Sequence, residues 1–426
     1  MQDGDAELPP GWRVAPLDEI VDAFYSGGTP STGFPAYWNG SIPWITGADI
    51  VDQKVVRPRR WLSVEGARCG GTNVVPSGGL LIVTRTGVGK VAIAPYDVAI
   101  SQDITGAIPR DGRVTGQFLY WWLATNSKRL EKLRQGTSIN GVVREDLAAL
   151  RIPVPPMDQQ RQIASVLSAI DDAIGKTEAV IAATERLRAA LLQELLTRGM
   201  PGWHTEWKTV PGIGTIPACW EVVRLRQIAE VRAGFALGPE RRPKTNPRPY
   251  LTVTNVQPDR VALKERRYME VSPQEYESRH LLAGDIVLVE GHAQLSELGR
   301  AAIVPPSAAG FTYQNHLFRV RADPTRSINR FLCAHINGPR GRAYFRSFGG
   351  TTSGLNTVST ANVQDLPVPL PSLEEQRLIG RVASAVDARL LTEQGALQHL
   401  VSVGSSVADA LLSGPGRSNA LVRASG

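Results

Sequence analysis

Cysteine is scarce in this chain, and the three residues present stand alone in the sequence. Cys69, Cys219 and Cys333 form no Cys-x-x-Cys pair, and the six histidines are scattered. A disulfide framework or a zinc site needs clustered ligands, so neither is expected. A chain of this kind fits a reducing compartment, and the sequence therefore predicts a cytoplasmic protein.

Long apolar runs are also missing. No segment approaches the roughly 18 consecutive apolar residues of a membrane-spanning helix, and the polar, acidic N-terminus has no signal region. We therefore expect no contact with a membrane. With 42% hydrophobic residues over 426 positions, the chain can still bury proper cores and has room for two domains plus helical spacers.

Motifs for catalysis and cofactor binding are weak. Residues 87–90 (Gly-Val-Gly-Lys) suggest a phosphate loop, but Thr84 stands where its first glycine belongs and Val91 follows the lysine. Residues 246–250 (Asn-Pro-Arg-Pro-Tyr) only superficially resemble the Asn-Pro-Pro-Tyr signature of amino-methyltransferases, because one residue is inserted. Nuclease and nucleophile motifs are not recognisable. The sequence predicts a protein without catalytic residues, cofactor or metal of its own.

The chain contains one ordered pattern twice. Residues 8–12 (Leu-Pro-Pro-Gly-Trp) open the first copy, and residues 216–220 (Ile-Pro-Ala-Cys-Trp) open the second. Proline-rich segments close the copies at residues 150–156 and 366–371, and a long helical pattern follows each closing. The period of about 200 residues is far above that of solenoid repeats, so the pattern indicates duplicated domains.

Each copy has the pattern of a mixed, strand-rich domain. Short β-branched runs are bounded by glycine and proline, as in buried strands. Matching runs occur in the same order at residues 44–46, 79–83 and 89–93 and at 250–252, 284–289 and 299–303. Residues 102–103 (Gln-Asp) likewise match residues 314–315 (Gln-Asn). A helix is predicted near the end of each copy, at residues 117–135 and 331–345.

The two long helical patterns run from residue 157 to 198 and from 374 to 412. About 42 residues at roughly 1.5 Å each give a helix on the order of 60 Å long. Neither apolar stripe can stay exposed, so we expect the two helices to pack as an antiparallel coiled coil. The alternative is that each helix folds back on its own domain. Gly395 and Gly404 leave the continuity of the second helix open, because glycine disfavours helix interiors.

In this combination of features, the chain resembles the specificity subunit of type I restriction-modification systems. The resemblance covers nearly the full length and depends on the openings at Leu8 and Ile216, the closings at 153–156 and 367–371, and the Gln-Arg helix starts at Gln160 and Gln376. It implies a non-catalytic DNA-binding subunit in which each of two target recognition domains binds one half of a split sequence in double-stranded DNA.

The resemblance also implies the partners and the fold. Methyltransferase (modification) subunits, usually two, dock on the helices, and restriction/translocase subunits join that core. S-adenosylmethionine, ATP and Mg are then expected only on partner subunits. The expected fold is α+β, with two mixed strand-rich domains separated by two long helices in a pseudo-two-fold tandem repeat. The predicted order is recognition domain 1 (1–152), central helical spacer (153–200), recognition domain 2 (201–366), C-terminal helical spacer (367–414) and a flexible tail (415–426).

Loop residues in matching places are the candidates for DNA contact. Arginine can fork onto guanine, glutamate can accept from cytosine, and hydroxyls and asparagine suit phosphate and adenine. The candidates at the strand–turn–strand junctions are Thr84, Arg85, Thr86 and Lys90, and Glu290, His292 and Arg300. Those in the polar loops before the closings are Thr137, Ser138, Asn140, Thr352, Ser353 and Asn356. For each residue alone, a solvated loop or a turn is the simpler explanation.

Other basic and helix-start residues have less specific roles. Arginine and lysine clusters can position a DNA backbone or be merely solvated, and they comprise Arg57, Arg59, Arg60, Arg241, Arg242, Lys244 and Arg248. Gln160, Arg161, Gln376 and Arg377 are candidates either for fixing the helix starts or for contacting a partner subunit. The net charge of +7 fits a polyanionic partner. The main alternative function is a two-headed interaction scaffold without sequence-specific DNA binding.

Overall fold

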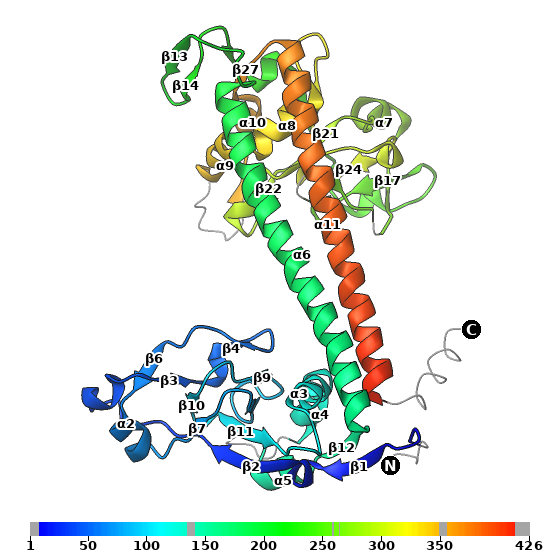
Figure 1. Ribbon diagram of the computed structural model, residues 1–426. Coiled ribbons are helices and arrows are strands. Elements are labelled where there is room, and N and C mark those ends of the chain that lie inside the picture. The colour runs from blue at the N-terminus through cyan, green and yellow to red at the C-terminus, as the bar shows by residue number, and fades with distance from the viewer. Residues whose placement is uncertain (1–7, 134–140, 258–259, 264, 349–355, 414–426) are drawn as a thin grey trace. The chain divides into compact units, whose positions relative to one another are not determined.

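The computed structural model describes residues 8–133, 141–257, 260–263, 265–348 and 356–413. The chain divides into two compact units: a first unit of Met1–Thr177 with Ala396–Gly426, and a second unit of Glu178–Gly395. Both long helices contribute to both units. Each unit therefore contains one strand-rich domain, the first part of the helix that follows it and the last part of the other helix (Figure 1).

The first unit is built on two four-stranded sheets. One is antiparallel, in the order β2 (Val21–Ser26), β11 (Ile104–Pro109), β8 (Leu80–Val83) and β9 (Val91–Ile93). The other has the order β6 (Arg60–Leu62), β3 (Ile42–Ile45), β10 (Val98–Ile100) and β7 (Val74–Val75), with β3 and β10 parallel. Strand β8 is buried throughout because its alternate side chains enter two different apolar clusters.

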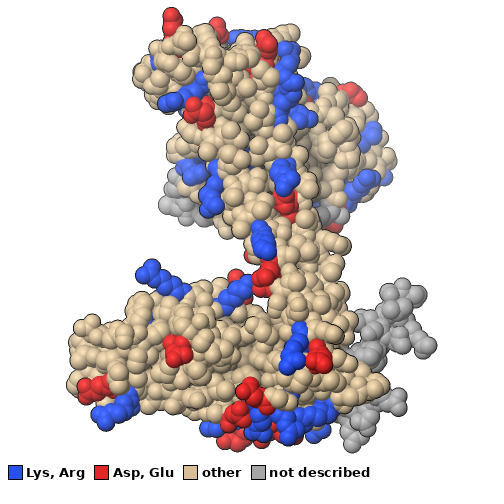
Figure 2. Space-filling view, viewed as in Figure 1, with Lys and Arg blue, Asp and Glu red and all other residues tan. Residues whose placement is uncertain are grey.

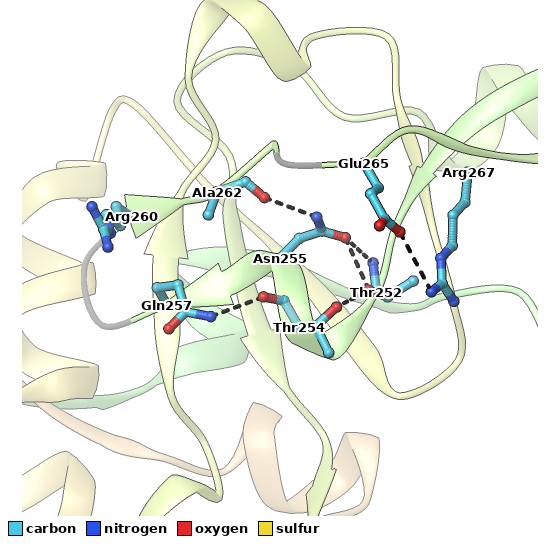
Figure 3. A pocket seen from close by; sticks show the side chains of 8 residues that line it. All are labelled: Thr252, Thr254, Asn255, Gln257, Arg260, Ala262, Glu265 and Arg267. Carbon is cyan, nitrogen blue, oxygen red and sulfur yellow. Dashed lines mark hydrogen bonds and ion pairs between the residues drawn. The ribbon is translucent and has the colours of Figure 1, made fainter. Parts of the chain in front are cut away.

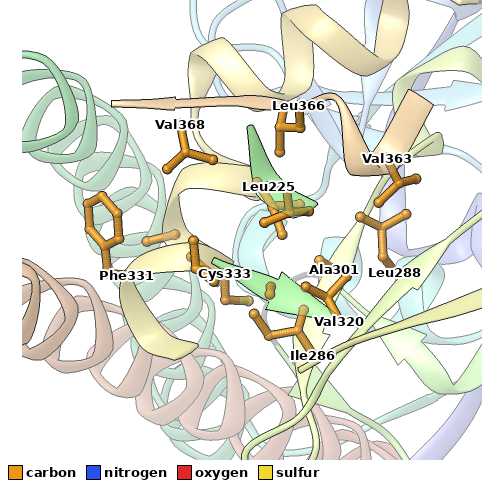
Figure 4. Close-up of a cluster of buried hydrophobic side chains, with 14 of the residues drawn as sticks. Leu225, Ile286, Leu288, Ala301, Val320, Phe331, Cys333, Val363, Leu366 and Val368 are labelled. Carbon is orange, nitrogen blue, oxygen red and sulfur yellow. The ribbon is translucent and has the colours of Figure 1, made fainter. Parts of the chain in front are cut away.

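The second unit repeats this topology. Its antiparallel sheet has the order β16 (Ala229–Ala233), β25 (Leu317–Ala322), β21 (Ile286–Val289) and β23 (Ala301–Ile303). A smaller sheet contains β20 (Arg267–Glu270), β17 (Pro247–Leu251) and β24 (Thr312–Tyr313), with β17 and β24 parallel. Ile286 and Leu288 face the main core shown in Figure 4. The matched strand runs of the sequence therefore take equivalent places in the two units, as predicted.

The opening and closing motifs of each copy are partners in one ribbon. Strand β1 (Arg13–Pro16) pairs antiparallel with β12 (Arg151–Val154), and β15 (Glu221–Arg224) pairs in the same way with β27 (Pro367–Leu370). Proline is tolerated there because these ribbons have only two strands, so its missing N–H need not serve a central ladder.

The helix predicted near the end of each copy is interrupted. In the first unit α3 (Gly116–Thr125) ends at Asn126 and α4 (Ser127–Lys132) follows. In the second unit α8 (Asn329–Asn337) ends at Gly338, and Pro339 begins α9 (Pro339–Arg346). The prediction of continuous helices was wrong because Asn126 caps α3 through Trp122 and Pro339 starts a new helix.

The two long helices are continuous. α6 spans Met157–Arg198, as predicted, and α11 spans Leu373–Ser413, so neither Gly395 nor Gly404 breaks it. In the first unit Ile163 and Leu167 of α6 share a core with Leu412 of α11. In the second unit the last turns of α6 share a core with the first turns of α11. The helices therefore pack antiparallel (Figure 1).

The remaining elements are short. In the first unit they are α1 (Leu17–Ile20), α2 (Val64–Cys69), α5 (Arg144–Ala148), β4 (Ile50–Val51) and β5 (Lys54–Val55). In the second unit they are α7 (Pro273–Arg279), α10 (Thr360–Gln364), β13 (Trp207–Val210), β14 (Gly214–Pro217), β18 (Val256–Gln257), β19 (Arg260–Val261), β22 (Gly291–His292) and β26 (Asn356–Thr357). Short 3₁₀ turns are η1 (Pro35–Trp38), η2 (Gly47–Asp49), η3 (Leu225–Gln227), η4 (Pro239–Arg241), η5 (Val253–Asn255), η6 (Leu295–Glu297) and η7 (Pro306–Ala308).

Two negative findings apply to the described ranges. No helix there combines the length and apolar character that a bilayer crossing requires. No group of three or more His, Cys, Asp or Glu side chains in the same ranges is arranged to hold a metal ion. The predicted tail at 415–426 lies outside the described residues, and the predicted domain boundaries stay predictions.

Candidate nucleic-acid interface

The junction between β8 and β9 presents polar side chains of the first unit. Thr84 is buried. Its backbone N–H donates to the Asp103 carbonyl at 2.8 Å, and its Oγ1 lies 3.3 Å from the hydroxyl of Thr105. Arg85 and Thr86 are exposed, and the Thr86 hydroxyl donates to Asp103 Oδ1 at 3.4 Å. Arg85 and Thr86 are therefore the candidates that a ligand can reach, and Thr84 fixes the loop.

The corresponding junction of the second unit follows β21. Glu290 lies 3.8 Å from His316 Nδ1, and burial raises the pKa of Glu290 while the nearby His316 opposes that rise. His292 pairs with Asn356 in the β22–β26 ribbon, and the Asn356 amide donates to the Ala293 carbonyl at 3.1 Å.

In each unit the chain just after the second predicted loop lies beside the strand junction. In the first unit the Val142 N–H donates to the Thr84 carbonyl at 2.7 Å, so the chain after the first polar loop lies beside the β8–β9 junction. In the second unit Val358, which follows β26, does the same, because its N–H donates to the Glu290 carbonyl at 3.0 Å. The other predicted members of these loops lie outside the described residues: Thr137, Ser138, Asn140, Thr352 and Ser353.

Lys90 and Arg300 have a shared structural role. The Lys90 ammonium donates to the carbonyls of Gly47 at 3.2 Å and Ile50 at 2.9 Å. The Arg300 guanidinium donates to the carbonyl of Val253 at 3.4 Å and pairs with Glu297. Each of these basic residues follows a glycine with positive φ. Lys90 bonds to carbonyls at turn η2, and Arg300 bonds to a carbonyl of the equivalent turn η5.

Sequence reasoning did not name Asp103 or His316 as site residues. Asp103 accepts from Thr86, and His316 lies beside Glu290, so both belong to the junctions. The available signal was the match between residues 102–103 and residues 314–315 of the repeat, which does not by itself indicate a contact with the junction loops. Gln102 also bonds to Thr29, a contact between distant segments that no local pattern indicates.

The helix starts are fixed by buried amides. Gln160 and Gln376 are fully buried at the first turns of α6 and α11. One residue earlier, Gln159 accepts from the Trp12 indole at 2.8 Å and Glu375 accepts from the Trp220 indole at 3.0 Å. The tryptophan of each opening motif is therefore attached to the helix that follows the domain. Arg161 and Arg377 are exposed, and Arg161 pairs with Asp158.

The duplicated arrangement of a strand-rich domain followed by a long helix matches a known family. The model of the type I restriction modification DNA specificity domain matches residues 9–185 and 217–400, which is most of the chain in two copies. The chain belongs to this family. Its members are non-catalytic specificity subunits, in agreement with the lack of catalytic motifs in the sequence.

Two curated relatives illustrate the sequence similarity of this specificity chain. The MjaIX specificity subunit of Methanocaldococcus jannaschii is 29% identical over 234 residues, which cover 54% of each chain. The EcoR124I/EcoR124II specificity subunit of Escherichia coli is 27% identical over 38% of this chain and 40% of its own length. The matched region thus spans about half or less of these relatives.

Solved structures extend the similarity of fold over the whole specificity chain. The S subunit of a type I restriction-modification system from M. genitalium matches 97% of this chain and 98% of its own, with a TM-score of 0.61 and 15% identity. A chain from a structure described as the basis of complex assembly and conformational transition of the type I R-M system matches with a TM-score of 0.57 and 18% identity. The fold of the specificity chain is therefore shared.

A polar pocket of about 390 Å³ lies in the second unit of the specificity chain (Figure 3). Asn255 accepts from the Thr252 N–H at 2.8 Å and donates to the Ala262 carbonyl at 2.8 Å. Arg260 and Arg267 also line the pocket. In the first unit Asp49 takes the place of Asn255, and its carboxylate bonds to Thr46 and to Arg59 at 2.6 Å. Burial opposes ionisation of Asp49, but these hydrogen bonds outweigh it and lower the pKa.

Most of the predicted basic clusters are held by neighbours in the specificity chain. Arg241 makes two hydrogen bonds to Glu275, which lower the pKa of that carboxyl to about 2. Arg248 lies over the Tyr276 ring at 4.3 Å, and Arg60 lies over the Trp38 ring at 4.9 Å. Arg57, Arg242 and Lys244 are exposed. On the visible face of each unit, basic and acidic side chains are interspersed (Figure 2).

Proposed function

We propose that this chain is the DNA specificity subunit of a type I restriction-modification complex and that each unit binds one half of a bipartite double-stranded DNA target. The observation that carries the proposal is that the two units share one strand topology but have different side chains at the junctions after the equivalent strands β8 and β21. Arg85 and Thr86 follow one strand, whereas Glu290 and His292 follow its counterpart. A repeated scaffold with unlike loops suits two recognition sites of unlike sequence.

The chemistry of the two junctions supports different half-sites. Arg85 is exposed and can donate two hydrogen bonds to the O6 and N7 atoms of guanine. Glu290 can accept a hydrogen bond from the amino group of cytosine, and Asn356 has the amide that suits adenine. Thr86 and the predicted threonine and serine residues of the polar loops suit contacts with phosphate.

We propose that the helical spacers set the separation of the half-sites and bind the methyltransferase subunits, two per specificity subunit, with the restriction/translocase subunits joining that core. The support is the unbroken length of α6, 42 residues, and of α11, 41 residues. A helix of this length is on the order of 60 Å. That is between one and two turns of B-DNA at about 34 Å per turn. S-adenosylmethionine, ATP and Mg belong to the partner subunits.

Reconstitution with the methyltransferase subunit tests the proposal. We expect a complex with two methyltransferase subunits in sedimentation velocity, and a methylated motif in two parts with a fixed gap of unread base pairs. A continuous motif would contradict the assignment of one half-site to each unit. Methylation without sequence preference, or a chain that binds proteins but not DNA, would favour the interaction scaffold.

DNA binding by the complex has a second signature. Neutralised phosphates release counterions, so the logarithm of the binding constant is expected to fall linearly with the logarithm of the salt concentration. A binding constant that is insensitive to salt would point to a partner other than a polyanion. The expected steep slope would agree with the net charge of +7.

A further inference from the structure

A thiol, an imidazole and a carboxylate stand in line in the second unit, away from the loop junctions. Cys219 Sγ lies 3.5 Å from His204 Nδ1, and His204 Nε2 lies 2.7 Å from Glu375 Oε1. The thiol is exposed, whereas the side chains of His204 and Glu375 are 9% and 2% exposed. A nucleophile, a base and a group that orients the base are the three parts of an activated thiol site.

The hydrogen bonds of Glu375 fix the orientation of the imidazole. Its carboxylate accepts from the Met200 N–H at 2.8 Å and from the Trp220 indole at 3.0 Å, in addition to His204. An ionised carboxylate only accepts hydrogen bonds, so the His204 proton belongs on Nε2. Nδ1 then presents its lone pair to the thiol and can take the proton of Cys219. The rings of Trp207 and Trp220 pack edge-on against His204 and hold its plane.

The first unit shows that the fold does not need these groups. There Trp12 makes the equivalent indole bond to Gln159, a neutral amide, at 2.8 Å. The residue before Trp12 is Gly11, in the place of Cys219. The attachment of the tryptophan to the helix is thus achieved without a thiol, an imidazole or a carboxylate. The thiol and the imidazole of the second unit are therefore not required for the contact between the tryptophan and the long helix.

We propose that Cys219 is a reactive thiol that forms mixed disulfides with low-molecular-weight disulfides such as oxidised glutathione. His204 Nδ1 takes the proton from Sγ, and the thiolate attacks one sulfur of the disulfide. The S–S bond breaks, and its electron pair leaves with the departing glutathione thiolate, which takes the proton from Nδ1. The products are a mixed disulfide at Cys219 and one reduced glutathione, so no further oxidant is required. Cys219 is the reacting residue, and Glu375 is a positioning residue.

The test is the rate of glutathionylation of each cysteine in the full chain, followed by mass spectrometry after incubation with oxidised glutathione. Cys69 is the internal reference, because it is also exposed but lies beside Tyr37 instead of an imidazole. We expect Cys219 to react about tenfold faster than Cys69. Equal rates for the two thiols would overturn the proposal.

Two variants separate activation from mere exposure. His204→Phe removes the base and keeps a ring between Trp207 and Trp220. Glu375→Gln reproduces the amide of the first unit and leaves one accepting oxygen for the Met200 N–H, the Trp220 indole and His204 Nε2, so the imidazole is held less firmly. We expect both changes to slow Cys219 by about tenfold and to leave Cys69 unchanged. Melting temperatures confirm folding, and ¹⁵N shifts report the His204 tautomer. Unchanged Cys219 rates in folded variants would refute the role of the imidazole.

Discussion

Gln160 and Gln376 make the same three hydrogen bonds, each in its own unit. The Gln160 carbonyl accepts from Thr115 N at 2.8 Å, and its amide donates to the carbonyls of Arg113 and Pro155. Gln376 accepts from Ile328 N at 2.9 Å and donates to the carbonyls of Arg326 and Pro371. Each amide joins the closing ribbon, the long helix and the cap of the domain helix at one point.

Replacing Gln160 by leucine is therefore expected to destabilise the first unit. Three backbone groups would lose their partner, of which the Pro155 carbonyl is in a buried bond and the other two are in part-buried bonds. Loss of the partner of a buried group costs about 1–3 kcal/mol, and loss at the part-buried groups costs less. Chemical denaturation measures the free energy of unfolding. Arg161→Ala is the matched control on the next residue, because Arg161 is exposed and its substitution should change stability by less than about 0.5 kcal/mol. Equal effects of the two substitutions would mean that the amide is not structural.

The sequence predicted the frame well and the side-chain roles less well. Strands such as β3 and the bounds of α6 followed from local hydrophobic period, which is a property of neighbouring residues. The role of Gln160 stayed open between helix start and partner contact, because two of its three partners, Thr115 and Arg113, lie 45 and 47 residues away and only the folded chain brings them together. Its burial and its three backbone partners favour the helix start.

The candidate site was predicted only in part for the same reason. The loops at Arg85 and Glu290 are polar insertions between buried strands, which a pattern can identify. A sequence pattern does not show that Thr84 is buried or that the Lys90 ammonium donates hydrogen bonds to two backbone carbonyls. Such partners depend on contacts between distant strands and turns.

Arg85 and Lys90 are expected to respond differently to substitution, although both are basic and lie in one loop. Arg85→Ala should leave the melting temperature unchanged and weaken discrimination at one position of one half-site by about 1–3 kcal/mol. Lys90→Met should lower the melting temperature, because the carbonyls of Gly47 and Ile50 lose their donor. Methylation assays on single-base target variants measure the first effect, and thermal unfolding measures the second. A loss of stability in Arg85→Ala would contradict this division of roles.

His335 is expected to make the second unit sensitive to acid. It is fully buried, its Nε2 lies 3.0 Å from the Pro367 carbonyl, and burial lowers its pKa from 6.5 to about 4. The unfolded chain therefore takes up the proton first as the pH falls. The contribution of this group to stability is complete above about pH 6.5 and decreases as the pH falls toward 4, by a few kcal/mol in total.

Unfolding measured between pH 7 and pH 4 tests this expectation. His335→Gln is the matched variant, because its amide can still donate to the Pro367 carbonyl but does not titrate in this range. We expect a smaller loss of stability with falling pH in the variant than in the parent chain. Parallel curves would show that His335 does not carry the dependence. Carboxylates such as Glu275, with a pKa of about 2, titrate lower and affect both proteins alike.

The two glycines of α11 provide a paired test of helix packing. A Cβ added at Gly395 would meet nothing within 4 Å, whereas one at Gly404 would lie 3.0 Å from Ile170 Cγ2 of α6. Alanine is favoured over glycine in a helix by about 1 kcal/mol, so Gly395→Ala should stabilise the protein by up to that amount. In Gly404→Ala the same gain is opposed by crowding against Ile170, and the change should be near zero or destabilising. Thermal unfolding of both variants distinguishes these cases, and Ile170→Leu, which removes the crowding Cγ2 methyl group, should restore the gain in the Gly404→Ala background. If the two alanine variants were equally stabilised, the close approach of the helices at Gly404 would be wrong.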